Sequence, residues 1–254
     1  MRRIVLKVGS AVLTQDGNLA LERLRKLVAL ITLLKEKYDV ILVSSGAVAA
    51  GYSLINLNKR IVANKQTLAA LGQPLLMDTY RKEFGRHDIL CSQVLLEATI
   101  FDDNTRLNHA RDAIEVMLKN NIVPIVNEND VTATEELVFG DNDQLAAYIT
   151  EYFYADMLVV LTDIDGFYDK NPHEFDDAKL QKTVNFIEES QLQEKHNANN
   201  EFATGGIVTK LKAADFLIKK NKKMFLTSGF DLAGANEFLL NDNQINGTIF
   251  EVKE

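Results

Sequence analysis

IVLKVGS, at residues 4–10, is an apolar strand pattern that runs directly into a glycine and a serine. Three later stretches repeat the arrangement: VILVSSGAVAAG at 40–51, IVPIVNEND at 122–130 and MLVVLTDIDG at 157–166. Near-continuous Val, Ile and Leu indicate strands that are covered on both faces, as in a parallel sheet between helices. Such sheets bind ligands at the carboxyl ends of their strands, so we expect the small and polar residues after each strand to form a binding site.

Amphipathic helix patterns separate the strands. The first, at 21–38, places its aliphatic residues on one helical stripe made of Leu24, Leu27, Val28, Ile31 and Leu34. Further helices are predicted at about 62–71, 74–86, 105–120, 142–154 and 206–220. Further strands are predicted near 39–44, 89–95, 122–126, 157–162 and 223–227. Regular alternation of this kind predicts an α/β sandwich with right-handed crossovers.

Two segments depart from the alternation. Residues 129–141 alternate short and polar side chains, which favours a hairpin or ribbon projecting from the sheet. Residues 188–204 are the most polar and least periodic part of the chain, and we expect a mobile loop near the active site there. A boundary near 150–156 would separate an N-terminal lobe, about 1–155, from a C-terminal lobe, about 156–254, within one domain.

Composition narrows the class of protein. The chain has 254 residues, 46% of them hydrophobic and 25% charged, which is enough to bury a full core. Its formal net charge of −8 argues against a global attraction to nucleic acid or to an anionic membrane. An anionic substrate would therefore have to be captured by local groups.

The single cysteine, Cys91, excludes an intramolecular disulfide framework and fits a reducing cytoplasm. It lies in the apolar stretch ILCSQVLL, which favours a buried structural thiol over a reactive one. The N-terminus shows no cleavage signal, and no run approaches the roughly 20 apolar residues of a membrane span. We expect a soluble, unprocessed protein.

The first two strand ends offer groups that suit an anion. Lys7 leaves the first strand beside Gly9, which lets backbone amides approach a phosphate closely, although a solvated surface lysine would explain the same short pattern. Ser44, Ser45 and Gly46 end the second strand and open a helix whose N–H groups would face a ligand. Tight packing of helix on sheet also requires small residues here, so both interpretations stay open.

The third strand ends in NEND, at 127–130. Half-buried carboxylates at Glu128 and Asp130 would need a cationic partner, which the ammonium of an amino acid would supply. An ordinary Asn/Asp turn would explain the same residues.

GDND, at 140–143, precedes a helical pattern. Asp141 or Asn142 can cap that helix, and Asp143 falls in its first turn. If Asp143 points into the crevice at the end of the sheet, it could hold two lysines through charge-assisted hydrogen bonds. Capping alone would explain Asp141.

TDIDG, at 162–166, and TGGIVTK, at 204–210, complete the set of polar clusters. Gly205 and Gly206 make a flexible turn suited to a phosphate, and Lys210 lies about one helical turn beyond it. The chain has neither a P-loop pattern nor a G-x-G-x-x-G fingerprint. Its four histidines lack metal-ligand spacing, so no metal site is predicted from protein ligands.

Taken together, these blocks resemble the glutamate 5-kinase branch of the amino acid kinase family. The resemblance runs in order through nearly the whole chain and is carried by KVGS at 7–10, SSGAVAAG at 44–51, NIVPIVNENDVTAT at 121–134, VFGDNDQLAA at 138–147, LTDIDGFYDKNP at 161–172 and TGGIVTKLKAAD at 204–215. It implies a three-layer αβα sandwich around a mainly parallel sheet, with glutamate bound in the N-terminal half and ATP in the C-terminal half.

The resemblance also implies the reaction: transfer of the ATP γ-phosphoryl group to the side-chain carboxylate of L-glutamate, the first step of proline synthesis. Lys7 and Lys210 would flank the transferred group, and Asp143 would organise the two lysines. Glutamate would be bound by Ser45, Gly46, Asp130 and Asn142. The nucleotide would be bound by Lys7, Gly9, Thr162, Asp163, Thr204, Gly205, Gly206, Ile207, Val208, Thr209 and Lys210.

Magnesium would arrive with ATP, held chiefly by phosphates and water. The family further implies feedback inhibition by proline, a homo-oligomer (dimer or tetramer) and functional coupling to glutamyl phosphate reductase. Many members carry a C-terminal PUA domain; this chain ends at GTIFEVKE, so we expect a form without it.

Two alternatives to glutamate 5-kinase activity remain. A related enzyme could use N-acetylglutamate, carbamate, aspartate or a nucleoside monophosphate as acceptor, but Glu128 and Asp130 favour an acceptor with a free ammonium. A non-catalytic amino-acid sensor would be expected to lose one transfer lysine, whereas Lys7 and Lys210 are both present.

Overall fold

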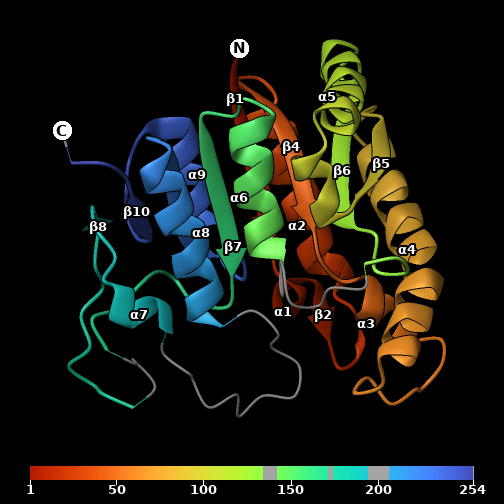
Figure 1. Cartoon of the computed structure of the whole chain (residues 1–254), viewed down its shortest axis with the longest axis horizontal. Coiled ribbons are helices and arrows are strands. Elements are labelled where there is room, and N and C mark those ends of the chain that lie inside the picture. Colours follow the sequence, from red (N-terminus) through yellow and green to blue (C-terminus); the bar gives the residue numbers. More distant parts are fainter. Residues whose placement is uncertain (134–141, 171–173, 194–205, 254) are drawn as a thin grey trace.

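The computed structural model describes residues 1–133, 142–170, 174–193 and 206–253. One eight-stranded sheet runs through these residues (Figure 1). Its order is β5 (Cys91–Leu96), β6 (Val123–Glu128), β4 (Tyr38–Ser44), β1 (Arg2–Val8), β7 (Met157–Thr162), β9 (Lys223–Ser228), β10 (Thr248–Phe250) and β8 (Thr183–Val184). A small hairpin, β2 (Thr14–Gln15) with β3 (Asn18–Leu19), forms a second sheet.

The sheet is mainly parallel, as the apolar strand runs predict. Every neighbouring pair from β5 to β9 is parallel, whereas β10 runs antiparallel to β9. The central strand β1 pairs with β4 on one side and β7 on the other, which sets Lys7 opposite Val43 and Val160. The carboxyl ends of these strands therefore meet at one edge of the sheet.

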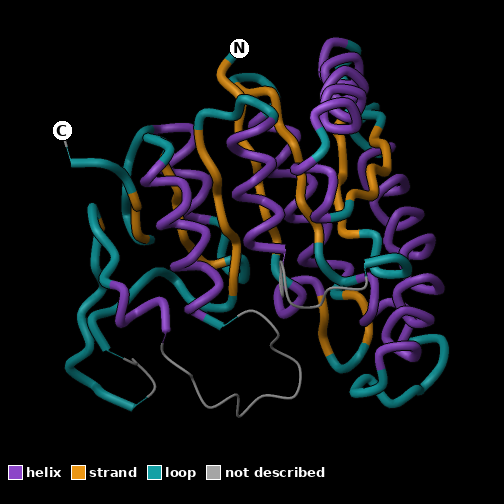
Figure 2. Tube along the Cα trace, in the orientation of Figure 1, coloured by secondary structure: helices purple, strands orange, loops and turns teal. Residues whose placement is uncertain are grey.

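Helices cover both faces of the sheet and complete three layers (Figures 1 and 2). One layer contains α2 (Leu21–Leu34), α4 (Val62–Gly85) and α9 (Ala233–Asn241), and the other contains α5 (Asn104–Lys119), α6 (Asn142–Tyr152) and α8 (Ile207–Lys219). Along β1, Leu6 packs in the core of the α2 side and Val5 in the core of the α6 side. The predicted three-layer αβα sandwich is confirmed.

The long helix α4 corrects one prediction from the sequence. We expect two helices, at 62–71 and 74–86, but the structure has one helix that continues through Pro74. A proline removes an N–H and strains the preceding turn. Here the buried stripe of Leu68, Leu76 and Tyr80 lies on both sides of the proline, so packing on the sheet keeps the helix continuous.

Close packing explains the small residues after β4. Helix α3 (Ala47–Tyr52) lies so near α4 that a Cβ added at Gly51 would stand 1.9 Å from the Leu68 carbonyl oxygen. A Cβ at Gly72 would stand 1.8 Å from the Ala47 carbonyl oxygen. The tight packing expected after this strand is therefore present, but it lies between two helices and not between a helix and the sheet. It explains the glycine at position 51 but not Gly46.

The segment predicted as a mobile loop at 188–204 is partly helical. Helix α7 (Glu189–Gln193) occupies its start, and residues 194–204 lie outside the described residues. The predicted ribbon at 129–141 is likewise described only to residue 133, with a turn in which the Thr132 N–H donates to the Asn129 carbonyl. Sequence patterns also missed the short α1 (Ser10–Leu13), α9, β8 and β10.

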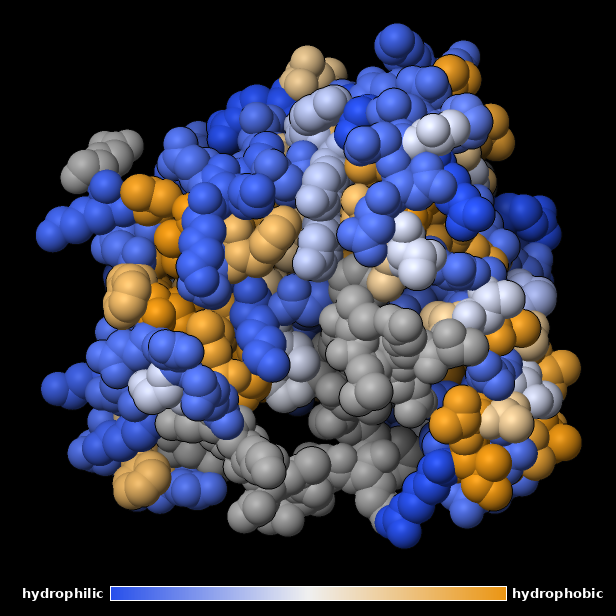
Figure 3. Space-filling model, viewed as in Figure 1, coloured by the Kyte–Doolittle hydropathy of each residue, from blue (hydrophilic) through white to orange (hydrophobic). Residues whose placement is uncertain are grey.

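The visible surface is largely hydrophilic, with apolar residues gathered over the α3–α4 connection and the start of α4 at the lower right, and beside α8 on the left (Figure 3). The exposed apolar side chains of this connection are Leu54, Ile55, Ile61 and Val62. Within the described ranges, no helix combines the length and apolar character that crossing a membrane requires.

Candidate active site

Three charged side chains meet at the carboxyl edge of the sheet. The Lys7 Nζ lies 2.5 Å from Asp143 Oδ1, and the Lys210 Nζ lies 3.1 Å from Asp143 Oδ2. All three are buried, with Lys7 2%, Asp143 0% and Lys210 4% exposed. Buried charges need partners of opposite charge, so this ion triad is a specific feature of the fold and not a chance contact between surface side chains.

The local structure explains how the triad forms. Side chains alternate along a strand, so Lys7 faces the same layer as Val5, which packs on the α6 side. Asp143 lies in the first turn of α6, where the helix dipole favours a carboxylate, and Lys210 lies in the first turns of α8. The Thr209 hydroxyl lies 2.9 Å from Asp143 Oδ2. The solvated-surface interpretation of Lys7 is therefore wrong.

Glycines shape the backbone beside the triad. The Gly9 N–H donates to the Leu161 carbonyl at 3.0 Å, which fixes the turn after β1 against the end of β7. Gly46 has φ +108°, a conformation that L side chains rarely adopt, and it opens α3. Gly206 is exposed at the N-cap of α8, and the first N–H groups of a helix have no carbonyl one turn earlier in the helix to which they can donate. Such N–H groups suit an anion.

Asn142 connects the triad to the second strand end. Its Nδ2 donates to the Ser45 Oγ at 3.1 Å, to the Ser44 carbonyl at 3.2 Å and to the Asn127 Oδ1 at 2.9 Å. Two of the residues predicted to bind an acceptor, Ser45 and Asn142, are thus in direct contact. Asn142 directly precedes Asp143 in α6, so a residue predicted to bind the acceptor is next in the chain to the carboxylate of the triad.

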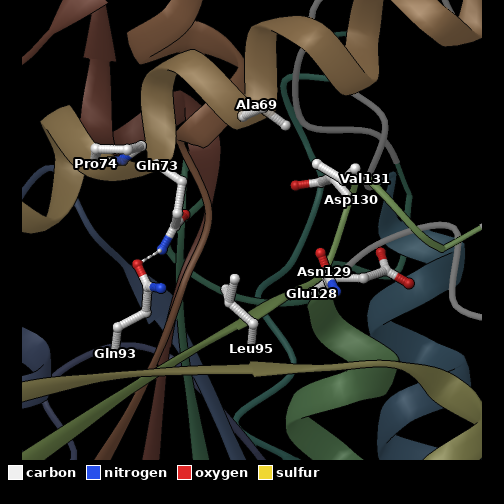
Figure 4. Close-up of a pocket in the computed structure, with 10 residues that line it drawn as sticks. Ala69, Gln73, Pro74, Gln93, Leu95, Glu128, Asn129, Asp130 and Val131 are labelled. Carbon is white, nitrogen blue, oxygen red and sulfur yellow. Dashed lines mark hydrogen bonds between the residues drawn. The ribbon is translucent and has the colours of Figure 1, made fainter.

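Asp130 lines a pocket of about 180 Å³ between α4 and the ends of β5 and β6 (Figure 4). Gln73 and Gln93 lie on one side of this pocket, and Glu128 and Asp130 lie toward the other. Burial raises the pKa of the Asp130 carboxyl, and the Lys65 ammonium opposes that rise. The pocket therefore offers amides and carboxylates to one small ligand.

The nucleotide-binding candidates are only partly described. Thr162, at the end of β7, is buried and donates to the Asp163 carboxylate at 2.8 Å, while Asp163 itself is exposed. Ile207 and Val208 are half-buried in the first turn of α8. Thr204 and Gly205 lie outside the described residues.

Sequence reasoning missed Gln73 and Tyr80, which α4 brings to the site. The Gln73 Oε1 accepts from the Asn127 Nδ2 at 3.0 Å, and the Tyr80 hydroxyl lies 2.9 Å from the Ser44 Oγ. A polar residue on the buried stripe of Ala69, Leu76 and Tyr80 was the available signal. The two helices predicted at 62–71 and 74–86 leave Gln73 between them, so the sequence pattern does not place it on this stripe.

In the part of the chain that the structure describes, no group of three or more His, Cys, Asp or Glu side chains is placed to hold a metal ion.

A profile of the amino acid kinase family matches residues 2–228 of this sequence. The chain belongs to the amino acid kinase family. Its relatives in this family include the glutamate 5-kinase of Wolinella succinogenes, 52% identical over 98% of both chains. The glutamate 5-kinase of Leishmania donovani is 48% identical over 98% of this chain and 95% of its own length.

Solved structures agree with the family fold. A product complex of T. acidophilum isopentenyl phosphate kinase superposes with a TM-score of 0.67 at 17% identity, covering 97% of this chain and 99% of that one. A UMP kinase from Ureaplasma parvum gives a TM-score of 0.65 at 14% identity, with 98% of each chain covered. At these identities the likeness concerns the family fold alone.

Proposed function

We propose that this protein transfers the γ-phosphoryl group of ATP to the side-chain carboxylate of L-glutamate and forms L-glutamyl 5-phosphate. The observation that carries the proposal is the convergence of two buried lysines on Asp143 at the carboxyl edge of the sheet. The 52% identity to a relative named glutamate 5-kinase supports this acceptor.

In the proposed step, a carboxylate oxygen of glutamate attacks the γ-phosphorus as the bond to the β–γ bridging oxygen breaks. ADP leaves with that electron pair, and no proton has to move because the acceptor is already ionised, with an ordinary pKa of about 4.3. The transition state is loose and spreads charge over the phosphoryl oxygens, so catalysis consists mainly of positioning and electrostatic stabilisation. Lys7 and Lys210 would supply that stabilisation, each oriented by one oxygen of Asp143.

Glutamate would lie against Ser45, Gly46, Asp130 and Asn142. The raised pKa of the Asp130 carboxyl indicates a poorly solvated carboxylate that would gain from pairing with the substrate ammonium. Glu128 lines the same pocket and strengthens the preference for a free amino group over an acetylated one. The acceptors named for the structural neighbours, isopentenyl phosphate and UMP, carry no such ammonium.

ATP would be held by the N-terminal end of α8 with Gly9, Thr162 and Asp163. Magnesium would be coordinated chiefly by the phosphates and water, since the described residues hold no cluster of three metal ligands. This arrangement would make residues 1–155 the glutamate-binding lobe and 156–254 the ATP-binding lobe.

We further propose a homo-oligomer in the cytoplasm, inhibited by proline and coupled to glutamyl phosphate reductase. The relatives named glutamate 5-kinase support these four points only through the family's place in proline synthesis. The exposed apolar side chains of the α3–α4 connection support a protein interface, because such clusters mark interaction sites.

The decisive experiment measures ADP release with glutamate, N-acetylglutamate and aspartate as alternative acceptors. Glutamyl phosphate is labile, so hydroxylamine trapping in the same reaction should detect the hydroxamate. We expect turnover with glutamate and little with the other two acceptors. Equal rates with all three, or ADP release without hydroxamate, would contradict the proposal.

A further inference from the structure

Four side-chain amides form a continuous chain from the pocket to the ion triad. The Asn142 Nδ2 donates to Asn127 Oδ1 at 2.9 Å, and the Asn127 Nδ2 donates to Gln73 Oε1 at 3.0 Å. The Gln73 Nε2 then donates to Gln93 Oε1 at 3.1 Å, a bond drawn in Figure 4. Three of these amides donate in the same direction, from α6 through β6 and α4 to β5, and Gln93 accepts at the end; we call the four amides the amide relay.

The backbone sets that direction. The Glu128 N–H donates to Asn127 Oδ1 at 2.9 Å, so this oxygen cannot exchange places with the amide nitrogen without setting donor against donor. The Asn127 nitrogen must therefore face Gln73, and the nitrogen of Asn142 must face Asn127. Gln73 and Asn127 are both buried, which makes an unmatched orientation costly.

The direction of these hydrogen bonds fixes the orientation of the Asn142 carboxamide. The side-chain nitrogen of Asn142 carries two hydrogens, and it donates to the oxygens of Ser44, Ser45 and Asn127. The carboxamide oxygen is then the polar atom of this side chain left to accept a bond from a ligand, and no described residue donates to it. Asn142 directly precedes Asp143 in α6, and the Asp143 carboxylate contacts both lysines.

We infer that Gln73 is a positioning residue for the acceptor: it holds Asn127, and through Asn127 it holds Asn142 with its carboxamide oxygen toward the substrate. The inference rests on the proposed glutamate kinase function. Gln73 acts at the middle of the relay and does not touch Asn142 itself. The Gln73 Oε1 accepts the hydrogen bond that the buried Asn127 Nδ2 donates, and without it that amide nitrogen would lose this acceptor.

Two substitutions separate this role from simple packing. Gln73→Met keeps the length of the side chain but removes the acceptor, and we expect the KM for glutamate to rise about tenfold while the KM for ATP stays unchanged. Gln73→Glu keeps an oxygen toward Asn127 and should restore the glutamate KM to within about threefold of the native value. Equal defects in both variants, or an equal rise in the ATP KM, would overturn the inference.

A double-mutant cycle tests whether Gln73 acts through Asn142. If it does, Gln73→Met should add almost nothing to the defect of Asn142→Ala, because the group that it positions is already gone. Additive effects of the two substitutions would show that Gln73 acts by another route and would overturn the inference.

A measurement without turnover distinguishes failure of this inference from failure of the proposed function. With asparagine labelled by ¹⁵N, the Asn142 side-chain amide can be assigned by its loss in Asn142→Ala. We expect that resonance to shift in Gln73→Met and to stay near its native position in Gln73→Glu. An unmoved Asn142 resonance in Gln73→Met would refute the relay, whether or not the native protein phosphorylates glutamate.

Discussion

Lys7, Asp143 and Lys210 are far apart in the chain, yet they share one buried cluster of charge. Each reaches it by a local rule: Lys7 by alternation along β1, Asp143 by its place in the first turn of α6, and Lys210 by its place near the start of α8. Removing one lysine leaves Asp143 paired with the ammonium of the other, so the fold should survive, while the positive charge proposed to stabilise the transferred group is halved.

We therefore expect Lys210→Met to lower kcat by about 10²- to 10³-fold, the usual effect of losing one preorganised electrostatic group. The rate of ADP release at saturating substrates measures this, with thermal unfolding as the check on folding. Lys212→Met is the matched control, because Lys212 is an exposed residue of the same helix and should leave kcat unchanged. Similar kcat values for the two variants would show that Lys210 does not contribute to the transfer step.

The raised pKa of Asp130 predicts that the KM for glutamate depends on pH. Its carboxyl pKa is raised by burial, so it takes up a proton at a higher pH than an exposed aspartate does. Protonation removes the charge that would pair with the substrate ammonium, so the KM for glutamate should rise as the pH falls through that raised pKa.

Asp130→Asn should raise the glutamate KM at neutral pH and abolish the further rise in acid. KM values for glutamate and ATP, measured from about pH 5 to pH 8, test this. If the acid-side rise persisted in the variant, another group would be responsible for it.

At the scale of elements, the contact of α3 with α4 positions the loop that carries Ser45 and Gly46. The backbones approach so closely that neither Gly51 nor Gly72 has room for a Cβ. Gly72→Ala should therefore push the helices apart and lower the free energy of unfolding by about 1–3 kcal/mol.

Gly85→Ala is the control in the same helix, because a Cβ there meets nothing within 4 Å and alanine favours a helix. Its free energy of unfolding should be unchanged or higher. Denaturant unfolding of both variants makes the comparison. If Gly72→Ala were as stable as the native protein, the helices α3 and α4 could not be in such close contact at this position.

At the scale of the whole molecule, one sheet joins the two proposed lobes. The pairing of β1 with β7 links the first strand of the chain to the second half, and both helical layers pack against strands from both halves. We expect the lobes to unfold together, because separating them would expose the centre of a continuous sheet.

Two core substitutions test that cooperativity. Leu42→Ala and Leu226→Ala, each at a fully buried position in a different half, should each lower the free energy of unfolding by about 2–5 kcal/mol. Fluorescence and circular dichroism should show one shared transition in each variant. A substitution that split the transition in two would instead establish independent lobes.

The amino-acid sequence by itself determined the class of fold and the edge of the sheet where the polar clusters gather. Strand and helix periodicities are local, and so is the rule that places Lys7, NEND and Asp143 at strand ends and helix starts. The family resemblance was also carried by contiguous blocks.

Only the tertiary structure decided which of these groups touch. Packing across Pro74 merged two expected helices into α4, and that one helix delivered Gln73 and Tyr80 to Asn127 and Ser44. The short β8 and β10 also form only because neighbouring strands supply their hydrogen-bond partners. Contacts between residues distant in the chain depend on how whole elements pack, and no local pattern records that packing.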